Sequence, residues 1–468
     1  MMEDTIVAVS TPAGIGAIAL VRLSGPAARD ILHRVFVPHR KGLDIRKEQG
    51  YTLHYGIIRE GQAELDDVVV TLFRAPRSYT GEDLVEIACH GSAYIQREIL
   101  NLLVRRGART AKPGEFTQRA FLNGKMDLSQ AEAVADLIAS TGRAAHRLAI
   151  SQIRGGFSRE LSVIRGELLH FVTLIELELD FSEEDVEFAD RTSLKLLVDG
   201  ILDKVSRLAV SFELGNAIKS GVPVAIVGET NVGKSTLLNT LLKEEKAIVS
   251  EIAGTTRDVI EDCIHLQGIE FRFIDTAGIR ETLDQIEHIG IGRSYAQMEK
   301  ARIILLLADA TAPAEQSLWW VGKISSHVRQ EQHLIILVNK ADLNPEEAKE
   351  RMVRIKESLV ANGNPPILEI SAKQGTGLAR LEEVLLELVH LEALESSDAV
   401  VSNARHYAAL VQARTALERT RLSLDTGISG EFLAQDIREA LHFLGEITGE
   451  ITTDEVLGNI FRNFCIGK

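Results

Sequence analysis

Cysteine is scarce in this chain of 468 residues, and Cys89, Cys263 and Cys465 are its only three. They are far apart and in no metal-ligand spacing, so neither a disulfide framework nor a zinc site is predicted, and a reducing compartment is expected. No apolar run approaches the roughly 18 residues that a membrane span needs. The start carries Glu3 and Asp4 where a signal peptide would be positively charged. These absences predict a cytoplasmic globular protein without membrane contacts.

Basic residues are outnumbered, with 52 Lys and Arg against 67 Asp and Glu, so the formal net charge is −15. This balance argues against a broad basic surface that wraps nucleic acid. Any contact with RNA should therefore be local or shared with a partner. The length predicts roughly two to four domains, and a hydrophobic content of 45% is enough for their cores.

Three kinds of sequence pattern divide the chain. Residues 1–120 mix short β-type runs such as DDVVVTLF with Gly and Pro, which predicts an α+β domain. Residues 121–217 and 381–468 repeat apolar positions every three or four residues, as amphipathic helices do. Residues 218–380 alternate apolar strands with polar helical stretches, which predicts a doubly wound parallel α/β sheet. The simplest architecture is an N-terminal α+β domain and an all-α domain, with the α/β domain inserted into the latter.

The stretch GETNVGKS matches the phosphate-loop pattern G-x-x-x-x-G-K-[ST] at Gly228, Gly233, Lys234 and Ser235. It follows an apolar strand and precedes a helical stretch, which is the context that the pattern requires. The glycines let backbone N–H groups close around phosphate oxygens, Lys234 can reach the β- and γ-phosphates, and Ser235 can bind Mg²⁺. A glycine-rich turn with a purely structural use is the alternative, and this context weakens it.

Three further motifs follow in the order typical of GTP-binding domains: DTAG, NKAD and SAK. The carboxylate of Asp342 can accept from N1–H and the exocyclic amine of guanine, whereas adenine presents an acceptor there, so GTP is predicted rather than ATP. The predicted nucleotide-binding residues are Asn231, Val232, Gly233, Lys234, Ser235, Thr236, Asp275, Gly278, Asn339, Lys340, Asp342, Ser371, Ala372 and Lys373.

Hydrolysis needs a residue that orients the attacking water, and Ile279 after DTAG cannot form that hydrogen bond. Glu287 lies twelve residues after Asp275, in a stretch long enough to bring a carboxylate toward the nucleophile. Taken alone, Glu287 is more simply interpreted as an exposed helix residue.

Further stretches occur along the whole chain in a characteristic order: TIVAVSTPAGIGAIALVRLSG, SYTGED, CHG, KPGEFTQRAFLNGKMDLSQAEAVADLI, IAGTTRD and the terminal FCIGK. With the inserted G domain, they resemble the MnmE (TrmE) family of tRNA modification GTPases over essentially the full length. The resemblance implies a homodimer built through an N-terminal domain that binds a one-carbon tetrahydrofolate, either the 5-formyl or the 5,10-methylene derivative. It also implies modification of the tRNA wobble uridine (U34) at C5 with a carboxymethylaminomethyl- or aminomethyl-type group, together with the flavoprotein MnmG.

The same resemblance implies roles for individual residues. Glu287 becomes the favoured water-orienting residue, and Thr256 joins Ser235 as a Mg²⁺ ligand. The resemblance also implies a K⁺ ion that would supply positive charge at the phosphates. Its implied ligands are Asn231, Ser250, Ile252 and Thr255.

Cys465 would ordinarily be a buried structural cysteine, whereas the resemblance implies that it faces the folate as a catalytic residue. The implied folate-binding residues are Arg22, Tyr79, Glu82, Arg119, Lys125 and Lys468. Salt bridges at the domain border explain Arg119 and Lys125 equally well.

Two alternatives stay open. One is an Era-type regulatory or ribosome-assembly GTPase, which would need neither folate nor a terminal cysteine. The other is a stand-alone folate-dependent one-carbon transferase with the G domain as regulator; since the chain has no flavin fingerprint, redox chemistry would still require a partner.

Overall fold

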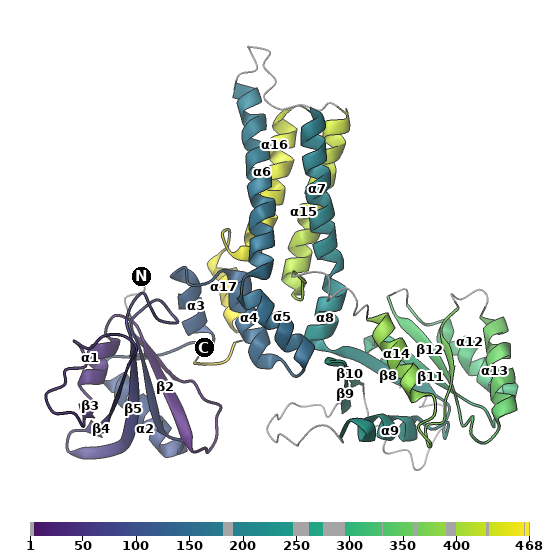
Figure 1. Cartoon of the computed structure of the whole chain (residues 1–468), viewed down its shortest axis with the longest axis horizontal. Helices are drawn as coiled ribbons and strands as arrows, with labels where there is room; N and C mark the ends of the chain where they lie inside the picture. Colours follow the sequence, from purple (N-terminus) through teal and green to yellow (C-terminus); the bar gives the residue numbers. More distant parts are fainter. Residues whose placement is uncertain are drawn as a thin grey trace. The chain divides into compact units, whose positions relative to one another are not determined.

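The computed structural model describes residues 4–180, 191–246, 262–274, 295–329, 331–359, 364–389, 399–426, 430–462 and 464–467 (Figure 1). The chain forms two compact units. The first consists of Met1–Ala139, Ile150–Lys204 and Ala409–Lys468, and the second of Ser140–Ala149 and Val205–Ala408. Both ends of the chain therefore belong to the first unit.

A seven-stranded sheet forms the N-terminal part of the first unit, with strand order β3-β4-β5-β6-β2-β1-β7. Neighbouring strands are antiparallel except for β1 and β7, which are parallel. The strands are β1 (Ile6–Val9), β2 (Ile18–Ser24), β3 (Phe36–Pro38), β4 (Thr52–Glu60), β5 (Ala63–Phe73), β6 (Leu84–His90) and β7 (Arg109–Thr110).

One face of this sheet is covered by α1 (Ala28–His33) and α2 (Ala93–Arg105). Val68, Val70 and Leu72 of β5 point into that core together with apolar residues of α2. The alternate residues of β5 are only half-buried, because successive side chains of a strand point to opposite faces. The sheet is thus closed on one face and more open on the other.

Long helices make up the rest of the first unit, and their apolar positions explain why they pack. Leu161, Ile164, Leu168 and Ile175 recur at helical spacing in α6 and are all fully buried. The helices that lie wholly or partly in this unit are α3 (Glu115–Leu122), α4 (Leu128–Ala139), α5 (Arg143–Ile153), α6 (Gly156–Asp180), α7 (Arg191–Val210), α15 (Ala404–Thr426), α16 (Gly430–Thr448) and α17 (Asp454–Arg462).

Polar contacts join helices of this unit that are distant in the sequence. Arg165 of α6 donates to the carbonyl oxygen of Leu441 in α16 at 2.9 Å. Lys204 of α7 donates to Glu167 of α6 at 2.7 Å. The helical segments before and after the second unit therefore contact each other within the first unit.

The second unit contains a six-stranded sheet of order β13-β12-β11-β8-β10-β9, parallel except for the β9–β10 hairpin. The strands are β8 (Val222–Gly228), β9 (Asp262–Leu266), β10 (Ile269–Phe273), β11 (Ile303–Asp309), β12 (His333–Asn339) and β13 (Ile367–Glu369). The helices that lie wholly within it are α8 (Phe212–Ser220), α9 (Lys234–Lys246), α12 (Ala314–Ser325), α13 (Pro345–Ser358) and α14 (Leu378–Leu388).

Both faces of this second sheet are buried. Val224 and Ile226 of β8 lie in one hydrophobic cluster, and Ala225 and Val227 lie in another. Near-continuous apolar strands are expected where helices cover both faces of a parallel sheet. The predicted doubly wound α/β fold is confirmed, as is the combination of an α+β N-terminal domain with helices.

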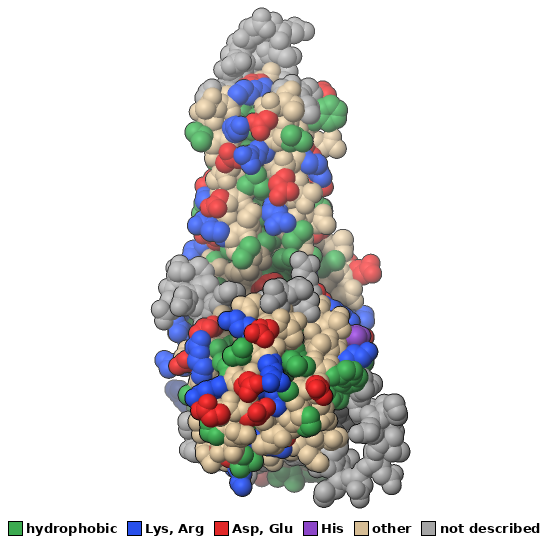
Figure 2. Space-filling view, turned by 90° about the vertical axis from the view of Figure 1, so that its right-hand side faces the viewer, with side chains coloured by type: hydrophobic (Ala, Val, Ile, Leu, Met, Phe, Trp, Pro, Cys, Tyr) green, Lys and Arg blue, Asp and Glu red, His purple; other side chains and the backbone are tan. Residues whose placement is uncertain are grey.

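Two further observations concern the surface. On the face of the molecule in Figure 2, basic and acidic side chains of the described residues are interspersed. None of the described helices is both long and apolar enough to span a bilayer.

Candidate functional site

The phosphate loop joins β8 to α9 at the carboxyl end of the strand, between neighbours β10 and β11. In open α/β sheets, ligands bind outside the carboxyl ends of the strands where the strand order reverses. Asn231, which is exposed, and Gly233 both have positive φ angles, of 62° and 103°. A Cβ atom on Gly233 would lie 2.3 Å from Nδ2 of Asn339. The loop therefore requires glycine at this position.

Lys234 begins α9, and its ammonium group turns back onto the loop. Nζ donates to the carbonyl oxygens of Gly228, at 2.8 Å, and of Glu229. Burial lowers the pKa of Lys234 to about 8, although the nearby charge of Glu229 acts in the opposite direction. A phosphate group would offer this half-dehydrated cation stronger acceptors than two carbonyls.

Asn339 connects the phosphate loop to two other predicted motifs. Its Nδ2 donates to the carbonyl oxygen of Val232 at 2.7 Å, and its Oδ1 accepts from the backbone N–H of Ala372 at 2.9 Å. The side chain is almost fully buried. Asp342 lies close to the loop that carries Ala372, because its Oδ2 accepts from Gln374 at 3.3 Å. The structure thus brings the GKS, NKAD and SAK segments together.

A cluster of charged residues behind the loop was missed by the sequence reasoning. Asp309, the last residue of β11, accepts from Nζ of Lys340 at 2.5 Å. Arg351, only 1% exposed, donates to the carbonyl oxygens of Asp309 and Ala312. The available signal was that Asp309 follows an apolar strand at the edge of the sheet where ligands bind.

Glu229, the residue after Gly228, is buried, and its Oε1 has no hydrogen-bond partner in the described part of the chain. Burial, followed by the nearby charge of Asp309, raises the pKa of Glu229. For Asp309 burial also acts upward, but hydrogen bonds from Lys340 and Thr311 outweigh it, so the pKa of Asp309 is lowered. Acidic residues, Glu229 and Asp309, and basic residues such as Lys340 therefore lie together next to the phosphate loop.

Several predicted site residues lie outside the described residues and have no structural account. They are Ser250, Ile252, Thr255, Thr256, Asp275, Gly278, Glu287 and Lys468.

The C-terminal tail, defined as residues 464–467, contacts the N-terminal sheet of the same unit. The backbone N–H of Gly114 donates to the carbonyl oxygen of Cys465 at 3.3 Å. The carbonyl oxygen of Gly467 accepts from the Ser10 hydroxyl at 3.1 Å and from Arg22 at 3.2 Å. Gly467 has a φ of 94°, and a Cβ there would lie 2.6 Å from a backbone oxygen of Val9. Cys465 is exposed, unlike an ordinary structural cysteine.

Arg22 links this tail to the sheet. It lies opposite Glu86 in the pairing of β2 with β6, and its guanidinium donates to that carboxylate at 2.7 Å and 3.0 Å. The guanidinium carbon is 5.7 Å from the ring centroids of both Tyr79 and Phe116. The Tyr79 hydroxyl hydrogen-bonds to Thr117, and burial raises the pKa of Tyr79. Arg22 therefore binds the carbonyl of Gly467 while its guanidinium lies near two aromatic rings.

Arg119 and Glu82 belong to a buried ionic network. Arg119 is 1% exposed and donates to Asp4 at 2.6 Å, to Glu82 at 3.1 Å and to Glu115 at 3.2 Å. Lys125 instead donates to the carbonyl oxygen of Pro76 at 3.0 Å, at an exposed position. Of the five predicted folate contacts that the structure describes, Arg22 contacts the tail and Tyr79 lies next to Arg22. Glu82 and Arg119 bind each other, and Lys125 lies on a separate loop.

A doubly wound sheet with a GKS loop after β8, NKAD at the end of β12 and SAK after β13 defines a P-loop module of the GTPase class. Two family descriptions match the chain: "GTP-binding protein TrmE N-terminus" over residues 5–125 and "MnmE helical domain" over residues 128–465. The curated protein "tRNA modification GTPase MnmE" of Bacteroides thetaiotaomicron is 54% identical over 468 residues, with 100% of both chains covered. Its namesake from Bacteroides fragilis strain NCTC 9343 is 53% identical, again with 100% of both chains covered.

Among solved structures, the crystal structure of the G domain of the T. maritima FeoB iron transporter matches 36% of this chain and 97% of that chain. The identity is 27% and the TM-score 0.26.

The chain belongs to the MnmE family of tRNA modification GTPases. The family resemblance found in the sequence is confirmed, and so is the enzyme class, a GTPase.

Proposed function

We propose that this protein hydrolyses GTP and takes part in modifying C5 of the wobble uridine U34 of certain tRNAs, with the flavoprotein MnmG as partner. The observation that carries this proposal is that the fold brings together the segments of two predicted sites. The phosphate loop is joined to the SAK segment through Asn339 of NKAD, and an exposed Cys465 lies on a tail that contacts the N-terminal domain. Names of its relatives support the tRNA substrate.

GTP fits the phosphate loop for a structural reason. The loop keeps its shape only with glycine at 233, where a Cβ would lie 2.3 Å from Nδ2 of Asn339, and Lys234 has only backbone carbonyls as hydrogen-bond acceptors in the described part of the chain. Lys234 would hold the β- and γ-phosphates, and Asp342 would read guanine, with the remaining predicted nucleotide-binding residues around them. Ser235 and Thr256 would bind Mg²⁺, whose positive charge offsets charge that develops on the phosphates. Glu287 would orient the attacking water.

A potassium ion fits the exposed Asn231, whose side-chain oxygen accepts no hydrogen bond from any described residue. Ser250, Ile252 and Thr255 would complete the ligand set. Such an ion supplies positive charge next to the phosphates, where other GTPases use an arginine. GTP turnover should then be faster in KCl than in NaCl at equal ionic strength, and equal rates would remove this role from Asn231.

A one-carbon tetrahydrofolate fits the region beside the tail because aromatic rings and a cation converge there. Tyr79 would face the flat pterin, and Arg22 would attract the carboxylates of the glutamate portion. Glu82 and Arg119 would keep the folate-binding residues in position. Lys125 and Lys468 would contribute positive charge at the edge of the folate site. Cys465 would act next to the transferred carbon. A homodimer formed through the N-terminal domains is part of the proposal and follows from the family.

The test is nucleoside mass spectrometry of bulk tRNA from cells that lack this protein. The cells are complemented with the native chain, with Cys465→Ser or with Lys234→Ala. We expect 5-substituted wobble uridines to disappear on deletion and to return only with the native chain. An unchanged nucleoside profile on deletion, in cells without a redundant pathway, would contradict tRNA modification and favour an Era-type switch. Full restoration by Cys465→Ser would remove the proposed role of that thiol.

A further inference from the structure

A short basic segment stands out in this acidic chain. Residues 39–47, the basic segment, follow β3 and contain Arg40, Lys41, Arg46 and Lys47 against a single carboxylate, Asp44. All four cations are exposed. The chain as a whole carries a net charge of −15, so this local excess differs from the average surface. A local cationic site is the form of RNA contact that such a composition allows.

Most of this positive charge is available to a ligand. Arg46 donates to Asp44 at 2.9 Å, and this hydrogen bond holds the pKa of the Asp44 carboxyl well below its usual range. Arg40, Lys41 and Lys47 form no ion pair with any residue in the described part of the chain. Three cations of the basic segment are therefore left without a carboxylate partner among the described residues.

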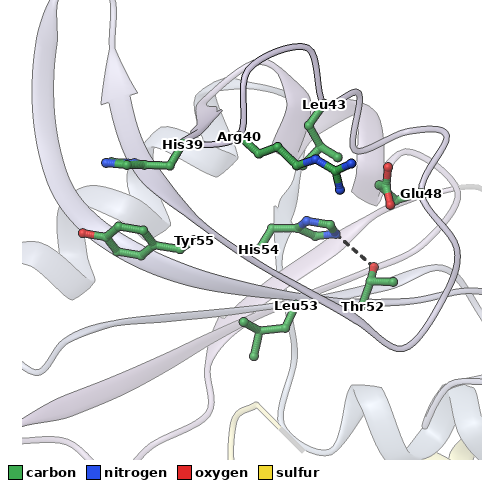
Figure 3. A pocket seen from close by; sticks show the side chains of 8 residues that line it. All are labelled: His39, Arg40, Leu43, Glu48, Thr52, Leu53, His54 and Tyr55. Atoms are coloured by element: carbon green, nitrogen blue, oxygen red, sulfur yellow. Dashed lines mark hydrogen bonds between the residues drawn. The ribbon is translucent and has the colours of Figure 1, made fainter.

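The same segment forms one wall of a pocket of about 440 Å³ (Figure 3). This volume falls within the range of about 300–1,000 Å³ that is usual for small-ligand sites. The other wall is β4 beyond the point where its pairing with β3 ends. The lining residues are His39, Arg40, Leu43, Glu48, Thr52, Leu53, His54 and Tyr55.

The pocket has an aromatic end and a charged end. His39 and Tyr55 lie at one end, with ring centroids 4.7 Å apart and an interplanar angle of 40°. Arg40 and Glu48 lie toward the other end, although no ion pair joins them. Between the two ends, His54 hydrogen-bonds to the Thr52 hydroxyl at 3.0 Å. Flat rings, hydrogen-bonding groups and a guanidinium thus line one cavity.

Large apolar side chains are also exposed around this pocket. Tyr55 is 50% exposed and Leu53 is 65% exposed, and both are on the open face of β4. Tyr51, which directly precedes the strand, is 67% exposed. Exposed aromatic residues next to cations are typical of surfaces that bind single-stranded nucleic acid, because bases stack on rings while phosphates meet Arg or Lys.

We propose that this pocket and the basic segment bind a nucleotide of a single-stranded part of the tRNA substrate. The base stacks against Tyr55 and His39 at the aromatic end of the pocket. Arg40 takes the phosphate in a charge-assisted hydrogen bond, and Lys41 and Lys47 attract the flanking phosphates. This inference rests on the proposed function for its substrate class. It places an RNA contact within this chain. The net negative charge of the chain, taken alone, would suggest that RNA is bound mainly by a partner protein.

An acidic segment of a partner protein is the competing occupant. Cations alone would suffice for such a partner, whereas the two aromatic rings, His39 and Tyr55, would have no role in binding it. RNA is favoured because it needs all of these groups at once. The two occupants differ in their dependence on Tyr55, which makes them separable by experiment.

The first experiment measures binding of the full-length protein to a fluorescent anticodon stem–loop RNA across a salt series. Arg40→Ala should weaken binding by at least about fivefold at low salt and lower the slope of log K against log[salt] by about one. The matched control is Arg97→Ala, since Arg97 is 66% exposed on α2, which covers the other face of the same sheet. Its affinity and slope should stay those of the native chain, and both variants should keep the native GTP turnover.

The second experiment separates base stacking from charge. Tyr55→Leu keeps apolar bulk without a π face and should weaken RNA binding by about tenfold, whereas Tyr55→Phe should bind within about threefold of the native chain. Thermal unfolding of each variant checks that the domain is intact. Native affinity in Tyr55→Leu, with loss only in Arg40→Ala, would overturn the nucleotide pocket and indicate an acidic protein partner.

The outcome for tRNA modification is a separate result. If the native chain fails to bind the stem–loop even at low salt, the RNA-binding pocket is wrong, while restoration of modified uridines by the native chain would still support the proposed function. If deletion leaves the tRNA nucleosides unchanged, the proposed function fails whatever the binding data show. Native binding by both Arg40→Ala and the double variant Lys41→Ala/Lys47→Ala would also overturn the pocket.

Discussion

The phosphate loop and the contact between the C-terminal tail and the N-terminal domain both depend on a closely packed glycine, but the residues that form them are separated by very different distances in the sequence. In each, a glycine with positive φ lies so close to another group that a Cβ would collide with it: Gly233 with Asn339, and Gly467 with Val9. The phosphate loop is a contiguous stretch of eight residues. The tail contact joins Ser10 and Arg22 to Gly467, which are 457 and 445 positions away. The phosphate loop can be recognised from a short stretch of sequence. The contacts of the tail can be recognised only in the folded structure.

The two regions also differ in how their buried charges are satisfied. Arg119 in the N-terminal domain has three carboxylate partners, whereas Oε1 of Glu229 beside the phosphate loop has no hydrogen-bond partner among the described residues. Nε of Arg119 also has no hydrogen-bond partner among the described residues, but its charge is compensated by these carboxylates, whereas burial and the nearby charge of Asp309 raise the pKa of Glu229. A buried group that is held in an unfavourable charge environment is expected where a ligand binds. This difference suggests that Arg119 acts through stability and that the phosphate loop acts through binding.

The largest expected effect is on stability. Arg119→Met should cost about 3–5 kcal/mol in the free energy of unfolding of the N-terminal part, because Glu82 and Glu115 lose a buried counter-charge. Denaturant unfolding followed by a probe in this region measures the loss. GTP turnover should stay close to native, since the second unit has its own core. An unchanged midpoint would mean that Arg119 is free for a direct role toward folate.

The same network predicts a dependence on pH. Burial acts to raise the pKa of Glu115, but hydrogen bonds from Arg109 and the Lys112 amide outweigh it, so the folded-state pKa lies below the ordinary value of 4.5. Its contribution to stability is therefore complete above about pH 4.5 and is lost as the pH falls through the lowered value. Acid unfolding should be shallower in Arg119→Met. Identical acid profiles for the two proteins would contradict this assignment.

A smaller effect is expected at the phosphate loop. Gly233→Ala should weaken GTP binding by about 1–3 kcal/mol, or roughly fivefold to more than a hundredfold, because the positive φ is strained for alanine. Equilibrium titration with a fluorescent GTP analogue measures the loss. Gly200→Ala is a matched control on α7, since a Cβ there meets nothing within 4 Å. Native affinity in Gly233→Ala would show that the loop can rearrange.

The smallest effect is expected for Ser10→Ala, which removes one hydrogen bond to the tail. The loss is worth about 0.5–1.5 kcal/mol, so the fraction of modified tRNA should fall only partly, with GTP turnover unchanged. Ser10→Thr keeps the hydroxyl and should restore the native level. Equal modification in all three chains would mean that Arg22 alone holds the carbonyl of Gly467.

The fold could be predicted where the apolar pattern is local and uninterrupted. The runs IVAVS, AIALVRL, DDVVVTLF and DLVEIACH correspond to β1, β2, β5 and β6. Strand β4, TLHYGIIRE, was not predicted because Gly56 interrupts its apolar pattern, and glycine weakens strand propensity. That glycine is required by the fold, since a Cβ there would lie 2.4 Å from the carbonyl oxygen of Val37. The antiparallel β9 was missed because its pattern is short and its two-residue turn, Gln267–Gly268, has glutamine where asparagine, aspartate or glycine is usual.

The candidate site follows the same rule. Motifs with fixed spacing indicated Lys234, Asn339 and Asp342, and these remain predictions of GTP contacts. Ser10 could not be predicted, because its importance depends on Gly467, which is far away in the sequence. Asp309 was missed although it ends an apolar strand, because its partner Lys340 is brought next to it only by the sheet. Contacts between residues that are distant in the sequence can be identified only once the complete fold is known.

The most direct test of two separable sites in one chain is to measure both outputs of Gly467→Ala. A Cβ on Gly467 meets a backbone oxygen of Val9 at 2.6 Å, so the tail that carries Cys465 must shift, while the phosphate loop is untouched. The measurement pairs nucleoside mass spectrometry of tRNA, from cells with this variant as the only copy, with GTP turnover of the purified protein. We predict loss of modified wobble uridines with turnover near the native rate. Full modification, or equal loss of both activities, would contradict the account.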